Sequence, residues 1–244
     1  MRLLLQRGAR VAALARRVDD ESAHRLLAGT GASEDSILAL KCDISDEAQV
    51  AACFDRTVSE FGKLDIVLAN AAICHPEKST MDTSIEEWTE TININLTGTF
   101  LTCKHAIRHM VQRRYGKIVL TDSSWAFVAE PGYASYVAAK GGVWSMGCNL
   151  ALENARHNIN VNMVCPGNID TPQLRAAIDL GDGSAEESIR KRFGQVSTTE
   201  EVAEVMLFLA SDRAAALQGA HIVVDHGASL KDGRGIIVEA PPVA

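Results

Sequence analysis

The chain has 244 residues, of which 47% are hydrophobic and 23% are charged, and these proportions suit a globular α/β protein with a sizeable core. A formal net charge of -7 argues against a nucleic-acid-binding surface, and no apolar run approaches the about 20 residues that cross a membrane, so neither kind of partner is expected. Six scattered cysteines form no CxxC pair and no Cys/His cluster at zinc spacing, which predicts free thiols in a reducing cytoplasm and no metal site.

The amino-terminal segment carries several arginines and no acidic residue before Asp19. This charge pattern is typical of a transit peptide, but the serines that such peptides contain are absent. Arg2–Leu5 followed by Gly8 is better interpreted as a helix end with a glycine stop, and Val11–Ala15 as a buried strand. We therefore expect a folded segment rather than a targeting signal.

Short apolar runs alternate with helical patterns along the rest of the chain. The predicted strands are residues 11–15, 37–42, 64–70, 117–121, 160–165 and 221–225. The predicted helices are residues 19–27, 46–61, 84–114 (broken into two), 133–154 and 199–211. Because the strands are continuous apolar runs, they should be buried on both faces, as in a doubly wound parallel sheet with helices on each side.

Residues 1–244 are expected to form one domain, with residues 230–244 as a carboxyl-terminal tail, because no repeat, linker or second domain is apparent. Residues 172–193 are less regular, which predicts a mobile helical insertion over a site. Two helix starts are well marked, since Ser84 and Thr198 are each followed three residues later by a glutamate, as in a capping box.

Tyr136 and Lys140 are four residues apart in a predicted helix, so their side chains share one face. An ammonium group beside a phenol favours the phenolate, and we expect Lys140 to lower the pKa of Tyr136 toward the range of a proton donor and acceptor. Ser123 follows a buried strand and would face this pair. The three residues outline a proton-transfer site, although a YxxxK pattern alone is short enough to arise by chance.

Ligands of a doubly wound sheet bind beyond the carboxyl ends of its strands. The residues at those ends are small, polar or turn-forming, as the close approach of a flat ligand requires: Ala15-Arg16-Arg17, Asp43-Ile44, Asn70-Ala71-Ala72, Ser123 and Pro166-Gly167. Asn70 and Pro166-Gly167 would serve equally as plain turn formers. Agreement among five strand ends favours a ligand site over that simpler interpretation.

In order and spacing, these residues resemble the short-chain dehydrogenases/reductases, from Arg2 to about Ser229. The landmarks are Asp43-Ile44, Asn70-Ala71-Ala72, Asn93-Ile94-Asn95-Leu96, Ser123, Tyr136 to Lys140, and Pro166 to Thr171. Each is weak alone, and together they are specific. The resemblance implies a Rossmann-type fold and hydride transfer between a nicotinamide cofactor and a small-molecule ketone or secondary alcohol.

The resemblance also implies catalytic roles. Tyr136 would be the acid/base, Lys140 would lower its pKa and hold the nicotinamide ribose, and Ser123 would hydrogen-bond the substrate oxygen. Asn95 would fix a water that relays protons from Lys140, or it could be a helix-interior amide that satisfies backbone groups. The hydroxyl of Ser124 is the alternative to that of Ser123 as the group that binds the substrate oxygen.

Further matched residues would bind the cofactor. Asp43 would touch the adenine, and Ile44 would pack beside it. The remaining positions are implied to line the cofactor or to meet its carboxamide: Asn70, Ala71, Ala72, Pro166, Gly167, Ile169 and Thr171. Tyr136 and Lys140 would also contact it.

The choice between NADP(H) and NAD(H) should depend on the residue after the first predicted strand. An NAD enzyme places a carboxylate there to bind the ribose 2′-hydroxyl, but Ala15 occupies that position and Arg16 follows. A guanidinium suits a 2′-phosphate, which favours NADP(H). Arg16 and Arg17 could instead be a solvated pair, and Asp19 and Asp20 lie close enough to keep NAD(H) open.

The amino terminus departs most from the family pattern. The family begins with a strand, a glycine-rich turn and a helix whose amino terminus binds the pyrophosphate, whereas this chain begins inside that helix. Gly29-Thr30-Gly31-Ala32 follows a helix and lacks a third glycine, so we interpret it as a turn. Because the missing strand is central in the family's sheet, its loss would leave two strand edges with polar groups that cost about 1–3 kcal/mol each when unsatisfied.

Three explanations compete for this departure. The working protein could be longer than the sequence given, or the chain could fold around the gap with little cofactor affinity. The tail at residues 235–239 could instead fill the vacant place or lie on a neighbouring subunit. The second explanation leads to the alternative function, an inactive binding or scaffolding subunit. Two smaller departures are Ala72, which would crowd the cofactor slightly, and His226, both commonly glycine in the family.

The loops after two predicted strands are apolar and partly aromatic: Ile73, His75, Pro76, Trp125, Phe127, Val128, Pro131 and Tyr133. Such a pocket would suit a ring or an aliphatic ketone, although the same residues could form the loops' own packing or a subunit contact. The family commonly forms dimers or tetramers through the helices at residues 95–114 and 133–154. The resemblance therefore implies a homodimer or homotetramer.

Overall fold

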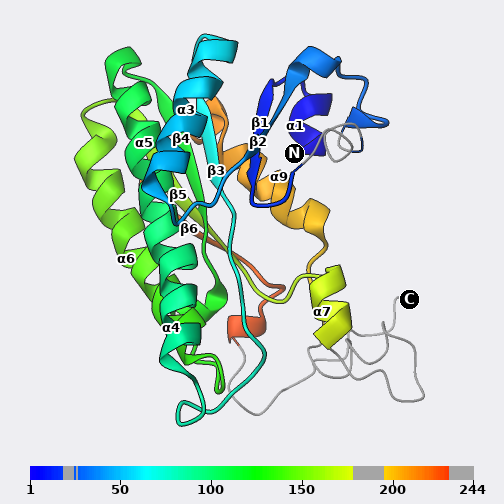
Figure 1. Cartoon of the computed structure of the whole chain (residues 1–244), viewed down its shortest axis with the longest axis vertical. Coiled ribbons are helices and arrows are strands. Elements are labelled where there is room, and N and C mark those ends of the chain that lie inside the picture. The colour runs from blue at the N-terminus through cyan, green and yellow to red at the C-terminus, as the bar shows by residue number, and fades with distance from the viewer. Residues whose placement is uncertain (19–24, 26, 178–194, 231–244) are drawn as a thin grey trace, which may run out of the picture.

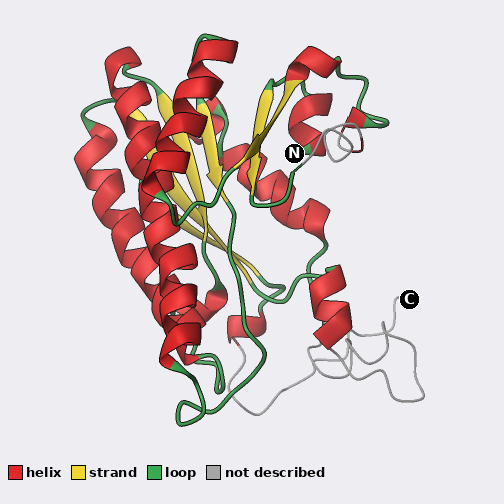
Figure 2. Cartoon of the chain, viewed as in Figure 1, coloured by secondary structure: helices red, strands yellow, loops and turns green. Residues whose placement is uncertain are grey.

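The computed structural model describes residues 1–18, 25, 27–177 and 195–230. The strands are β1 (Val11–Ala15), β2 (Ile37–Lys41), β3 (Ile66–Ala69), β4 (Gly116–Thr121), β5 (Ile159–Pro166) and β6 (His221–Val224). The helices are α1 (Arg2–Gln6), α3 (Glu47–Phe61), α4 (Ile85–Ile92), α5 (Gly98–Arg113), α6 (Ala134–Ala155), α7 (Pro172–Ala177) and α9 (Thr199–Leu209). Strands and helices alternate along the chain, as the sequence predicted (Figures 1 and 2).

Short turns of helix complete the described elements: η1 (Glu34–Ser36), η3 (Ser124–Ala126), η4 (Asp212–Ala214), η5 (Ala228–Leu230) and the π-helical turn η2 (Asn93–Thr97). The predicted break within residues 84–114 is this π turn, which joins α4 to α5. Most of the predicted helix at 19–27, most of the predicted insertion at 172–193 and the tail beyond residue 230 lie outside the described residues. None of the described helices has the length and apolar character to cross a membrane.

All paired strands are parallel, and they form two hydrogen-bonded sheets. One contains β1 and β2, and the other has the order β3-β4-β5-β6. None of the described residues pairs β1 with β3, so the two sheets are separate there. This division lies where the first strand of the family was expected to be missing. The carboxyl ends of the four strands of the larger sheet still lie along one edge, as parallel pairing requires.

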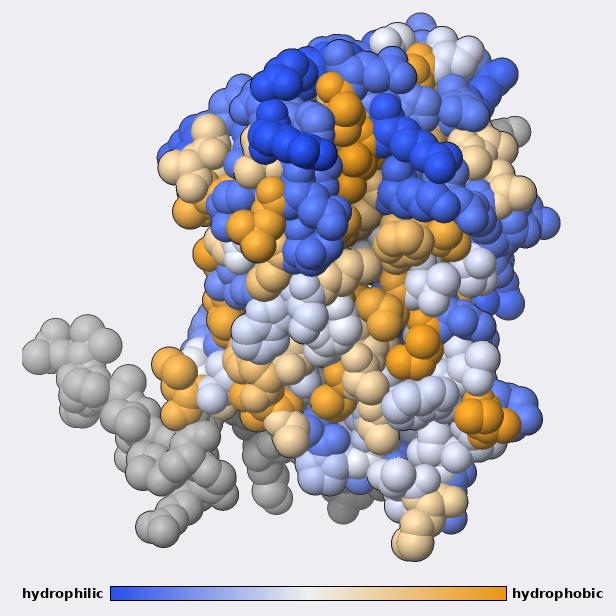
Figure 3. All heavy atoms as spheres, turned by 90° about the vertical axis from the view of Figure 1, so that its left-hand side faces the viewer, coloured by the Kyte–Doolittle hydropathy of each residue, from blue (hydrophilic) through white to orange (hydrophobic). Residues whose placement is uncertain are grey.

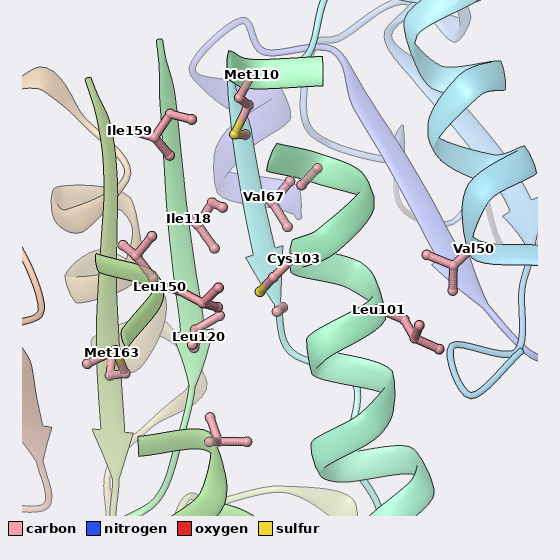
Figure 4. Packing of buried hydrophobic residues seen from close by; sticks show 14 of the residues in the cluster. Val50, Val67, Leu101, Cys103, Met110, Ile118, Leu120, Leu150, Ile159 and Met163 are labelled. Carbon is pink, nitrogen blue, oxygen red and sulfur yellow. The ribbon is translucent and has the colours of Figure 1, made fainter. Parts of the chain in front are cut away.

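The four-stranded sheet is covered on both faces by helices, which makes the fold doubly wound (Figures 1 and 2). Because side chains alternate along a strand, Ile118 and Leu120 of β4 join the cluster with α5 and α6, where Figure 4 shows them near Cys103 and Leu150. Val119 faces the opposite way, into a cluster with α9. Each such burial contributes about 1.5–3 kcal/mol, so the two clusters hold the sheet rigidly beneath its functional edge.

Two helix starts have the caps that the sequence predicted. The Ser84 hydroxyl accepts a hydrogen bond from the backbone of Glu87 at 3.1 Å, and the Glu87 carboxylate accepts one from the backbone of Ser84 at 3.3 Å. Thr198 and Glu201 form the same reciprocal pair at the start of α9. These capping boxes satisfy amides that the first helical turn leaves unpaired, and they fix where α4 and α9 begin.

Candidate active site at the carboxyl edge of the sheet

A buried lysine connects α6 to the end of β4. Lys140 is 3% exposed, and its Nζ donates a hydrogen bond to the carbonyl of Thr121 at 2.6 Å. The Thr121 hydroxyl in turn donates to the side-chain oxygen of Asn70 at 3.0 Å, just beyond β3. These two contacts hold Lys140, Thr121 and Asn70 at one edge of the sheet, where the sequence placed the ligand site.

Ser123 and Tyr136 meet at the same edge. Ser123 is buried just after β4, and its side chain lies close enough to the Tyr136 phenol to favour the phenolate by hydrogen bonding. The Ser123 oxygen also accepts from the backbone N–H of Trp125 at 3.2 Å, which fixes the serine rotamer at the start of η3. Tyr136 lies one helical turn before Lys140, with the Lys140 Nζ 5.5 Å from the centre of its ring. The structure thus brings together the serine, tyrosine and lysine that the sequence singled out.

Asn95 supports this site through the backbone rather than by direct contact. Its side chain is 1% exposed within the π turn, where its oxygen accepts from the N–H of Ile73 and its nitrogen donates to the carbonyl of Ile73, both at 2.8 Å. These contacts match the second of the two roles considered for Asn95, that of a helix-interior amide that satisfies backbone groups. The pair of bonds anchors the loop after β3 next to Cys74, which interacts electrostatically with Tyr136 and Lys140.

The expectation that Lys140 lowers the pKa of Tyr136 is wrong in this structure. Burial raises the pKa of Tyr136, Cys74 raises it further, and the hydrogen bond from Ser123 opposes the shift. Burial likewise lowers the pKa of Lys140 to about 8, with Asp122 opposing that shift. Removal of both groups from water disfavours their charged forms, and this effect exceeds the attraction expected between an ammonium and a phenolate.

Two residues at this edge were not found by the sequence analysis. Asp122 lies between Thr121 and Ser123 and is 2% exposed, and Cys74 is partly buried in the loop after β3. Both interact electrostatically with Lys140 and Tyr136. The sequence signal for Asp122 is a carboxylate at the end of a buried strand, to which the sequence analysis assigned no role.

A separate cavity of about 440 Å³ lies at the ends of β1 and β2 and along α4. Arg16, Asp43 and Ser45 line it together with Glu86 and Glu90. The Asp43 carboxylate accepts from the Ser45 backbone at 2.9 Å and from the Ser45 hydroxyl at 2.6 Å, and these bonds lower its pKa with help from Arg16. An ionised carboxylate and a guanidinium therefore face one cavity, at the position expected for the adenosine part of a cofactor.

Of the other residues expected to bind the cofactor, some are exposed to solvent and others pack within the protein. Asn70, Ala71 and Ala72 are exposed at the end of β3, as a ligand-lining loop requires. Gly167 follows β5, and a Cβ there would lie 2.7 Å from the Cβ of Asp225, so a close approach of two strand ends explains this glycine. Pro166 ends β5.

Three expected cofactor residues have contacts within the protein. Ile169 packs against the α9 cluster, and the Thr171 hydroxyl accepts from the backbone of Leu174 at 3.1 Å. Ile44 packs on α5, where a Cβ at Gly98 would lie 2.7 Å from the Ile44 side chain. The sequence interpretation of these residues did not include such packing and capping.

Comparison with known proteins identifies the family. The family model described as enoyl-(acyl carrier protein) reductase matches residues 1–229. Cis-4-hydroxycyclohexanecarboxylate dehydrogenase of Sinomonas cyclohexanicum is 40% identical over 228 residues, which cover 93% of this chain and 89% of that protein. The chain belongs to the short-chain dehydrogenase/reductase family. Levodione reductase (27% identity) and ElxO with NADP bound (28% identity) each superpose with a TM-score of 0.86, covering 94% of this chain and 92% of theirs.

As a short-chain dehydrogenase/reductase, the protein is an oxidoreductase that transfers a hydride between a nicotinamide cofactor and a carbonyl or secondary alcohol. The relatives named above are dehydrogenases or reductases, and they give no support to the alternative of an inactive scaffolding subunit. The residues fit such a cofactor, because a cavity with a guanidinium lies at the ends of β1 and β2, and the exposed Asn70 loop lies at the edge of the larger sheet that holds Lys140.

Proposed function

We propose that Tyr136 is the acid/base of this hydride transfer, that Ser123 orients and polarises the substrate oxygen, and that Lys140 completes the proton path. The observation that carries the proposal is that Ser123 lies close enough to Tyr136 to influence its ionisation, with the buried Lys140 5.5 Å from the centre of the tyrosine ring. Two hydroxyls that are already close need little rearrangement to bind one substrate oxygen between them.

The protein's own groups would move one proton in each turnover. In the reductive direction Tyr136 donates its phenolic proton to the substrate oxygen as that oxygen gains charge. Ser123 donates a hydrogen bond to the same oxygen, and its own position is fixed by the bond from the Trp125 backbone. A bound nicotinamide would supply or accept the hydride. The raised pKa of Tyr136 keeps the phenol protonated until the substrate oxygen develops charge.

The substrate class that we infer is an alicyclic or aliphatic ketone and its secondary alcohol. The ring of Trp125 meets Tyr136 edge-on at 5.7 Å and lies 4.8 Å from the ring of Tyr133, so aromatic surface adjoins the reacting phenol. Flat apolar walls of this kind suit a carbocycle. The relative from Sinomonas cyclohexanicum is named for a hydroxycyclohexane substrate, which supports the same class here.

NADP(H) is the cofactor that we favour over NAD(H). Ala15 ends β1, and Arg16 follows it into the cavity that Asp43 also lines. A guanidinium at this point can bind a 2′-phosphate bidentately, whereas Ala15 offers no carboxylate to a 2′-hydroxyl. ElxO, one of the similar structures, has NADP bound. Asp19 and Asp20, which kept NAD(H) open, lie outside the described residues.

We further propose that the protein acts in the cytoplasm as a homodimer or homotetramer formed through α5 and α6. All six cysteines lie in the described part of the chain and are free, as a reducing compartment favours. Figure 3 shows the side on which α5 and α6 lie, where apolar groups occur between polar ones. Phe100 of α5 and Leu152 of α6 are 44% and 80% exposed, which supports burial against a second copy.

Replacement of Tyr136 by phenylalanine tests the proposed function. The protein would be assayed with NADPH and NADH against cyclohexanone, and in the reverse direction against 4-hydroxycyclohexanecarboxylate. Tyr136→Phe should reduce turnover by at least about 100-fold and leave cofactor affinity, followed by nicotinamide fluorescence, largely unchanged. Tyr115→Phe is the matched control, because the Tyr115 hydroxyl donates to Asp212 at 3.1 Å, away from the site.

Undiminished turnover by Tyr136→Phe would reject the acid/base assignment. Failure of the unaltered protein to bind either nucleotide at micromolar concentration would instead favour the scaffolding alternative. The two outcomes are read from different measurements, so they cannot be confused.

A further inference from the structure

Asp122 is a buried carboxylic acid that the proposed reaction does not use. It follows Thr121, whose carbonyl binds Lys140, and precedes Ser123. Its backbone N–H donates to the carbonyl of Val164 at 2.8 Å, so strand pairing with β5 fixes where the side chain begins. With 2% of the residue exposed, the carboxyl group has almost no access to water.

The carboxyl group of Asp122 is only partly satisfied by the protein. One oxygen accepts a long contact from the Cys165 thiol, at 3.9 Å, and the backbone N–H of Ser123 also favours the ionised form, but Oδ1 is buried with no hydrogen-bond partner. An isolated buried carboxylate is costly, so its charge requires a nearby cation. Lys140 is the cation that interacts electrostatically with the Asp122 carboxylate. Among the described residues, neither Asp122 nor Lys140 is in direct ion-pair contact with an opposite charge.

We propose that Asp122 is a positioning residue of the active site, whose buried carboxylate, one residue beyond the carbonyl that binds Lys140, keeps the Lys140 ammonium charged and in place. The two groups are held close because the Lys140 Nζ binds the carbonyl of Thr121, the residue before Asp122. The consequence for turnover rests on the proposed function, in which Lys140 completes the proton path.

The groups that face Asp122 come from two elements. From α6 these are Lys140 and Tyr136, and from β5 the thiol of Cys165. Burial raises the pKa of Asp122 to about 7, while Lys140 opposes the shift. Asp122 acts on Lys140 in the reciprocal direction and raises its pKa against the effect of burial. Loss of the carboxylate should therefore let the Lys140 proton leave at a lower pH.

The test is a direct titration of Lys140 by NMR, with lysine labelled with ¹³C at Cε. The signal of Lys140 is the one missing from Lys140→Arg. In Asp122→Asn, and separately in Asp122→Ser, its midpoint should fall by about one pH unit relative to the unaltered protein. Asp225→Asn is the matched control: Asp225 is also a buried carboxylate at a strand end, but it is satisfied by the backbones of Gly227 and Ser229.

Asp225→Asn should leave the Lys140 midpoint in place. A Lys140 midpoint that stays within about 0.2 units in both Asp122 variants overturns the proposal, whatever the variants do to stability. The alkaline limb of turnover against pH should move down with the midpoint, and an unmoved limb alongside a shifted midpoint would also overturn the positioning role. If no substrate is turned over at all, the proposed function fails while the NMR titration still decides the charge coupling.

Discussion

The buried Lys140 should lower the stability of the folded protein. Its ammonium is 3% exposed, and burial lowers its pKa from 10.5 to about 8. The unfolded chain therefore binds a proton at Lys140 more tightly than the folded protein does. Below about pH 8 the buried ammonium destabilises the fold, and this penalty disappears as the pH rises through 8 toward 10.5.

The size of the effect follows from the shift. At about 1.4 kcal/mol per pKa unit, the penalty near neutral pH is about 3 kcal/mol. Lys140→Met keeps most of the side-chain volume and removes the charge. It also leaves the Thr121 carbonyl without its partner, which costs about 1–3 kcal/mol at every pH. Because that cost does not change with pH, the quantity to measure is how the difference in unfolding free energy changes with pH. Relative to Lys140→Met, the unaltered protein should gain about 2–3 kcal/mol of unfolding free energy between about pH 7 and about pH 10.

Urea unfolding followed by tryptophan fluorescence at a series of pH values measures this difference. Lys104→Met is the control, because Lys104 forms a surface ion pair with Glu47 at 2.6 Å that should contribute under about 1 kcal/mol. Parallel stability curves for Lys140→Met and the unaltered protein across this pH range would refute the argument. Such curves would mean that Lys140 is solvated or fully compensated in the folded state.

Other predictions concern the fold, the assembly and the cofactor. Gly98→Ala should lower the unfolding free energy by about 1–3 kcal/mol in urea, because its Cβ would lie 2.7 Å from Ile44; an unchanged midpoint would contradict this close packing. The double variant Phe100→Glu/Leu152→Glu should shift the mass measured by light scattering to that of a monomer, and an unaltered mass would place the interface elsewhere. Arg16→Ala should weaken NADPH binding at least about tenfold with little effect on NADH, whereas equal losses would argue against a 2′-phosphate contact.

The strands and helix starts were predictable because they depend on local patterns. The apolar run at Val11–Ala15 is β1 to the residue, and the glutamates three positions after Ser84 and Thr198 form the expected capping boxes. The serine, tyrosine and lysine of the site were also predictable, since their spacing along one strand and one helix fixes which edge they share.

The remaining features of the site depend on contacts that the spacing of residues in the sequence does not reveal. The direction of the Tyr136 pKa shift is set mainly by burial, and only the folded structure shows how deeply the phenol is buried. Asp122 was missed for a related reason, because a carboxylate after a strand is as typical of a turn as of a buried charge. The division into two sheets, by contrast, lies where the family pattern led us to expect a missing central strand.

The π turn between α4 and α5 adds one residue to a helix that would otherwise run on regularly. Each residue of an α-helix turns the chain by about 100°, so this extra residue changes which side chains of α5 face inward relative to those of α4. Deletion of Ile94 would restore the ordinary repeat and swing Asn95 away from Ile73. The loop after β3 would then lose its anchor, so this change in helical phase is what holds that loop to the segment between α4 and α5.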